Sequence, residues 1–156
     1  MVWLEALSYL VTILGFPAAV YVIAREERLR RENEESELHR NLSQEYNEFL
    51  KLVMSNADLL LLSKSSLPEP LSDEQQERTG VIFRMLISLF EKAYIILHTN
   101  DLDGDAHRRW SSWEDDMIEW CRKKDFRTAL PDLLVGEDVE FSRYILELVE
   151  TRGTKK

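Results

Sequence analysis

Cysteine, glycine and proline are scarce in this chain of 156 residues, with one, five and four residues respectively. The only thiol, Cys121, cannot close an intramolecular disulfide, and without partner ligands it makes no zinc site. The few glycines and prolines exclude a collagen-like or linker-dominated chain, and the 44% hydrophobic content excludes wholesale disorder. The length predicts one domain of ordinary size.

Positive charge is in the minority, with 20 Lys and Arg against 29 Asp and Glu, a formal net charge of -9. A nucleic-acid binder needs a basic face that displaces counterions from phosphates. We therefore expect no nucleic-acid partner.

One long apolar run is present over residues 6–24, ALSYLVTILGFPAAVYVIA, which carry no formal charge. As a helix this run spans about 28 Å, close to the hydrocarbon thickness of a bilayer. No Lys or Arg precedes it, which argues against a cleaved signal peptide. The run predicts a transmembrane helix over residues 1–24, with a buried core helix as the alternative.

Basic residues follow the apolar run and none precedes it. The cluster consists of Arg25, Arg28, Arg30 and Arg31. Such clusters stay on the cytoplasmic side. The pattern predicts a single-pass protein of the cell membrane, with its N-terminus outside and the C-terminal domain in the cytoplasm.

Small residues recur along the apolar run at Ser8, Thr12, Gly15 and Ala19. Their spacing places them on one helix stripe, where they allow two membrane helices to approach closely. This stripe predicts packing against a transmembrane helix of another subunit or of a second copy. Chance composition is the alternative.

The rest of the chain predicts an all-α fold. Residues 25–37 read as a charged helical stalk, with Glu26–Arg30 and Glu27–Arg31 in the favourable order for ion pairs. Apolar periodicity and capping signals then predict a cytoplasmic α-helical bundle over 38–150, before a flexible tail over 151–156. Its expected helices cover residues 38–62, 72–98, 106–122 and 138–149, with a short helical turn over 126–130.

Three tryptophans, Trp110, Trp113 and Trp120, lie at helical spacing in the third of these helices. We expect them to form core, because each ring buries a large apolar area, although a cage around a cation or a cofactor is the alternative. The acidic residues 114–116 are expected on the opposite, solvated face.

No pattern predicts catalysis or a metal. Residues 101–105 begin like an EF-hand loop, but Ala106 and Ser112 replace the required Gly and Glu. The histidines His39, His98 and His107 lack ligand spacing, and Cys121 lies on an apolar face. We therefore expect no enzyme, no metal and no cofactor.

The sequence resembles a broad group of short bacterial membrane proteins of unknown function. The resemblance is carried by WLEALSYLVTILGFPAAVYV, REERLRRENEE and the pattern W-x-x-W-E-D-D-M-x-x-W-C-R-K-K-D-F. It implies an architecture and no catalytic residues. The expected function is a non-enzymatic accessory or interaction subunit of a membrane complex with a protein partner on the cytoplasmic side. The alternative is a self-assembling membrane sensor or effector whose helical domain binds a ligand. A third hypothesis, a membrane-tethered enzyme, requires a polar pocket that the sequence does not reveal.

Overall fold

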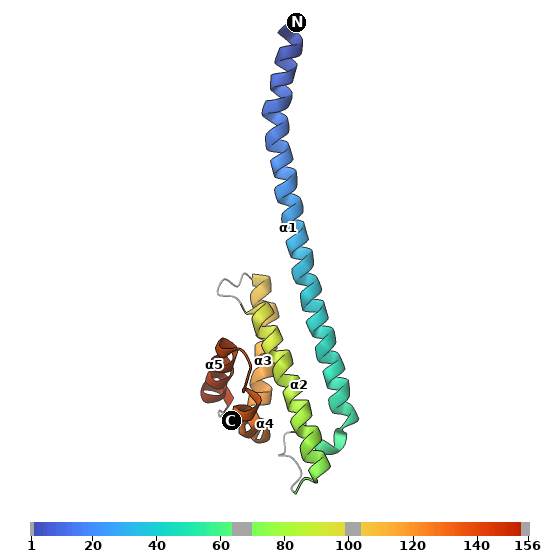
Figure 1. Cartoon of the computed structure of the whole chain (residues 1–156), viewed down its shortest axis with the longest axis vertical. Helices are drawn as coiled ribbons and strands as arrows, with labels where there is room; N and C mark the ends of the chain where they lie inside the picture. Colours follow the sequence, from blue (N-terminus) through green and yellow to red (C-terminus); the bar gives the residue numbers. More distant parts are fainter. Residues whose placement is uncertain (1, 64–69, 99–103, 154–156) are drawn as a thin grey trace. The chain divides into compact units, whose positions relative to one another are not determined.

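The computed structural model describes residues 2–63, 70–98 and 104–153, with side chains from residue 19 onward except those of residues 32, 35 and 105. Its elements are α1 (Val2–Ser55), η1 (Ala57–Leu59), α2 (Asp73–Leu97), α3 (Gly104–Cys121), α4 (Lys124–Leu133), α5 (Val139–Leu148) and the π-helical η2 (Val149–Gly153) (Figure 1). These described residues contain no strand, which confirms the all-α prediction. The chain divides into two units, Met1–Arg40 and Asn41–Lys156.

The first unit is the N-terminal part of α1. Its described side chains are solvent-exposed over almost their whole range, and they are joined by ion pairs along the helix. Arg31 contacts Glu27 at 3.3 Å, as predicted, whereas Arg30 contacts Glu34 at 3.5 Å. Pairs of this spacing stabilise a solvated helix by a few tenths of a kcal/mol each.

The predicted membrane location is wrong. Within the part of the chain that the structure describes, no helix combines the length and the apolar character that crossing a bilayer requires. The described side chains of α1 begin with a short apolar stretch, 19–24, and charged residues follow closely from Arg25 onward. The single-pass topology, with the N-terminus outside and the C-terminal domain in the cytoplasm, is therefore withdrawn.

Helix α2 is the central element of the second unit and contacts α3, α4 and α5. It begins with a capping box. Gln75 N donates to Ser72 Oγ at 3.2 Å, and Ser72 N donates to Gln75 Oε1 at 3.0 Å. This arrangement satisfies backbone donors that the first turn leaves unpaired. Farther along, the side chains of Leu86 and Phe90 are fully buried.

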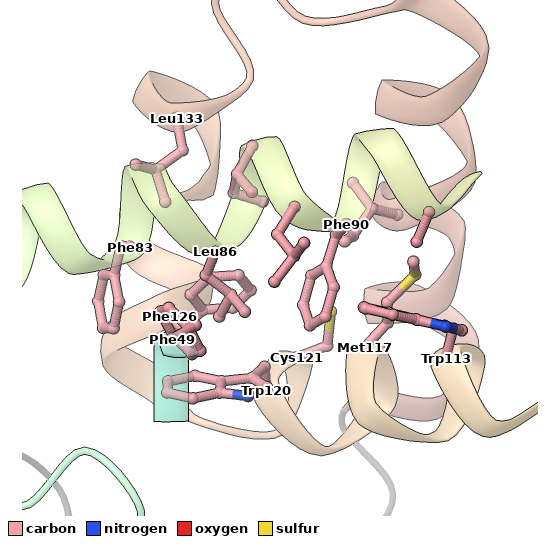
Figure 2. Packing of buried hydrophobic residues seen from close by; sticks show 14 of the residues in the cluster. Phe49, Phe83, Leu86, Phe90, Trp113, Met117, Trp120, Cys121, Phe126 and Leu133 are labelled. Atoms are coloured by element: carbon pink, nitrogen blue, oxygen red, sulfur yellow. The ribbon is translucent and has the colours of Figure 1, made fainter. Parts of the chain in front are cut away.

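Large aromatic rings join α1 to α3 in this unit. The Tyr46 and Trp113 ring centroids lie 5.4 Å apart, and those of Phe49 and Trp120 lie 6.0 Å apart. Figure 2 shows the rings of Phe49 and Trp120 on the same side of α2 as Trp113 and Met117. Buried aromatic rings carry much of the hydrophobic stabilisation of a small core.

Helix α1 ends at Ser55, before the expected end near residue 62. The short helix η1 follows, and its C-cap is Leu60, whose positive φ of 52° prevents a right-handed helix from continuing to residue 62. The turn is held by Arg78, which donates to Asp58 Oδ2 at 2.8 Å and to Asn56 Oδ1 at 2.8 Å. These bonds tie the end of α1 to α2.

The π-helical η2 includes residues 151–153, which are the first residues of the predicted tail over 151–156. Gly153 is buried, and a Cβ at this position would lie 3.0 Å from the Cys121 carbonyl oxygen. Arg127 Nη1 donates to the carbonyl oxygens of Cys121 at 2.9 Å and of Gly153 at 3.3 Å. The guanidinium thereby caps α3 and holds η2 against it.

Candidate functional site

An open groove of about 520 Å³ lies between the C-terminal part of α1 and α2, within the second unit. We call it the α1/α2 groove. Its floor consists of the apolar side chains of Phe49, Met85 and Leu89. Its rim is polar and comes entirely from α1, through Asn41, Gln44, Glu45 and Glu48.

Helical periodicity explains this composition. The four rim residues follow one another at i, i+3, i+4 and i+7, so they form one stripe along α1. Met85 and Leu89 are four residues apart and share a face of α2. The groove is thus bounded by a polar stripe on one helix and an apolar pair on the other.

The two rim carboxylates form exposed ion pairs within the chain. Glu45 Oε1 lies 2.5 Å from Lys92 Nζ of α2, and Glu48 Oε1 lies 2.7 Å from Lys51 Nζ. All four side chains are about half exposed or more. Exposed pairs of this kind contribute little free energy, so either can be exchanged for another ion pair at small cost.

Apolar side chains continue from the groove along the outer face of α2. Val81, Met85 and Ile95 are 51%, 47% and 61% exposed. With Ser88 and Lys92 they follow a repeat of four and three residues, which places them on one face. Such a face on an otherwise well-packed helix is typical of a surface that contacts another helix.

A second cluster gathers around His98, the residue that caps α2. Its ring stacks on Tyr94 with centroids 4.5 Å apart and lies 4.8 Å from Trp110 of α3 and 5.2 Å from Tyr144 of α5. Burial lowers the pKa of His98, while the charge of Glu114 opposes that shift. This His98 cluster joins three helices through ring contacts.

Glu114 lies beside the His98 cluster and is partly buried, so the expectation of a solvated side chain is wrong. The Tyr144 hydroxyl donates to Glu114 Oε1, and Arg152 Nη1 lies 3.4 Å from Oε2. Burial, followed by the hydrogen bond and charge of Glu114, raises the pKa of Tyr144. Both partners of the carboxylate therefore come from the C-terminal part of the chain.

Asp116 is also partly buried, whereas Asp115 between the two is exposed. Asp116 lies near Tyr46 of α1, and burial raises the pKa of its carboxyl. Burial and the charge of Asp116 raise the pKa of Tyr46 to about 12. The carboxylates on either side of Asp115 thus join α3 to α5 and to α1, which is a structural role.

The residues singled out from the sequence do not meet in one place. Trp110, Trp113 and Trp120 lie in the core, and Arg25, Arg28, Arg30 and Arg31 are exposed on α1. Ala19 is exposed, while the side chains of Ser8, Thr12 and Gly15 lie outside the described residues, as do residues 101–103.

Cys121 is fully buried, and burial raises the pKa of its thiol to about 12, so thiolate is scarce at neutral pH. His98 lies in its aromatic cluster, whereas His107 is exposed on α3. Among the described side chains, no three His, Cys, Asp or Glu residues are placed to hold a metal ion.

Sequence reasoning did not find the α1/α2 groove. The only signal in the sequence was the polar stripe over 41–48. This stripe lies beside the apolar face of the same helix without disturbing its spacing, so it looks like an ordinary solvated face. Comparison of the chain with known protein-family models, curated proteins and solved structures gives no match. The resemblance to short bacterial membrane proteins stays a prediction.

Proposed function

We propose that this protein is a non-enzymatic interaction protein that binds a protein partner through the α1/α2 groove. The observation that carries the proposal is the combination of an apolar floor with a polar rim, continuous with exposed apolar side chains on α2. Binding surfaces share this organisation, with apolar contacts at the centre and polar groups around them.

The shape of the groove favours a helix as the bound element. Its walls are two neighbouring helices, α1 and α2, which run in opposite directions in the second unit (Figure 1). A third helix lying along such a pair places its side chains at three- and four-residue spacing into the gap. Met85 on the floor suits this role, because its unbranched side chain adapts to different partners.

Site-specific photo-crosslinking tests the proposal. A photoreactive amino acid at Gln44, on the rim, should crosslink to one distinct polypeptide in the cells that produce the protein. The charge introduced by Met85→Asp should abolish that product, because it places a carboxylate on the apolar floor.

The matched control places the same photoreactive group at Arg143, which is exposed on α5 and does not line the groove. It should not give the Gln44 product. If both positions give the same product, or if Met85→Asp leaves the Gln44 product unchanged, the groove does not bind the partner.

A further inference from the structure

Resting on that proposed function, we propose that the α1/α2 groove takes a basic amphipathic helix of another protein. The partner's apolar residues would lie on Phe49, Met85 and Leu89. Its Lys or Arg side chains would pair with Glu45 and Glu48.

The polar rim of the groove is acidic. Glu45 and Glu48 are the only charged residues among the described side chains that line the groove. They lie on one stripe with Asn41 and Gln44, whose amides add hydrogen-bonding groups. A basic partner exchanges the exposed pairs with Lys92 and Lys51 for pairs across the interface, and the net charge of -9 favours its approach.

The floor of the groove offers apolar side chains for the partner to contact, in addition to the ion pairs at the rim. Phe49 and Leu89 are 4% and 7% exposed, so they form a fixed base, whereas Met85 is half exposed and can move over a partner. Apolar anchors give such an interface its affinity, and rim charges give it orientation and specificity.

A second copy of the chain is the rival occupant, and charge argues against it. Two copies each carry the same net charge of -9 and the same acidic rim. The chain's own arginine-rich stretch, 25–31, is interleaved with glutamates, and Arg31 is already paired with Glu27. A partner of opposite charge meets no such repulsion.

The test uses the full chain and two labelled synthetic peptides about 18 residues long, a length that spans about 27 Å as a helix. Both carry leucines on one face; one has Lys and Arg on the other face, and the matched peptide has Glu there. Fluorescence anisotropy should show the basic peptide binding roughly tenfold more tightly or better, as expected for two rim pairs. The preference should shrink in high salt.

Three variants separate the contributions. The double charge reversal Glu45→Lys with Glu48→Lys should remove or invert the preference for the basic peptide. Met85→Asp should weaken both peptides, and Val135→Asp, at an exposed position outside the groove lining, should change neither. Circular dichroism and denaturation confirm that each variant is folded.

The outcomes distinguish the two proposals. If both peptides bind equally and Met85→Asp weakens both, the basic partner is wrong and the groove remains a binding site. If Met85→Asp changes the binding of neither peptide, both proposals are wrong. If light scattering shows a dimer that the double charge reversal disrupts, the occupant is a second copy, and the inference of a different basic partner is overturned.

Discussion

Trp113 and Asp115 are two positions apart on α3 and occupy opposite environments. Trp113 is 4% exposed and packs on Tyr46, whereas Asp115 is exposed to solvent. Successive positions on a helix are separated by about 100°, so a side chain two residues from the core-facing stripe can point outward. Two nearby positions on one helix therefore differ completely in solvent exposure.

We expect Trp113→Ala to lower the free energy of unfolding by about 3–5 kcal/mol, because it leaves a cavity where a large ring was buried. Asp115→Ala should change it by less than about 0.5 kcal/mol. Denaturation monitored by circular dichroism measures both. Equal and small effects would mean that the Trp113 ring is not part of the core.

At the scale of elements, the carboxyl groups of Glu91 and Glu137 lie close together where α2 meets the start of α5. Glu91 of α2 accepts a hydrogen bond from the backbone N–H of Asp138, the residue that caps α5. Glu137 lies beside it, and burial, then the hydrogen bond and charge of Glu91, raise the pKa of Glu137. A raised pKa means that the folded state holds the Glu137 proton more tightly than the unfolded chain does.

This shift predicts a pH dependence with a definite sign. As the pH rises from about 4, the ordinary pKa of Glu, through the raised value, Glu137 should lower the free energy of unfolding. Glu137→Gln should therefore stabilise the protein at neutral pH and lose that advantage below about pH 4. Urea denaturation across the pH range measures the difference between variant and wild type.

Glu147→Gln, at an exposed position on α5, is the control for this experiment and should leave the pH profile unchanged. A Glu137→Gln profile parallel to that of wild type would show that folding does not raise the pKa of Glu137. The α2–α5 contact would then be independent of pH.

At the scale of the whole molecule, the two units differ in how they are stabilised. Among the described side chains, the buried hydrophobic residues begin at Leu42, so the core belongs entirely to the second unit. In the first unit, the described side chains from residue 19 onward are mostly exposed and form ion pairs along the helix, such as Glu27–Arg31. We therefore expect residues 41–156 to be stable on their own.

We expect a chain beginning at residue 41 to fold with nearly the same free energy of unfolding as the full chain, within about 0.5 kcal/mol. The helix that remains, 41–55, keeps its buried contacts through Leu42, Phe49 and Val53. Denaturation and near-ultraviolet circular dichroism compare the two chains. A shortened chain with helical content but no fixed aromatic signal would show that residues 1–40 contribute to the core's packing.

Local sequence by itself determined much of the helical architecture. The start of α2 follows from Ser72 and Gln75, whose capping box needs only four consecutive residues. The helical spacing of Trp110, Trp113 and Trp120 predicted a buried stripe, because periodicity is a local property of a helix. The same reasoning misjudged residues 1–24, since an apolar run indicates that a segment is apolar and not where the folded chain lies.

Only the tertiary structure decided the features that join distant parts of the chain. Glu114 and Asp116 looked like solvated acids, and their burial depends on Tyr144 and Tyr46 arriving from other helices. The α1/α2 groove likewise exists because Glu45 and Met85, far apart in sequence, border the same space. Periodicity predicts which face of one helix is apolar. Whether a neighbouring helix covers that face or leaves it exposed depends on how the helices pack.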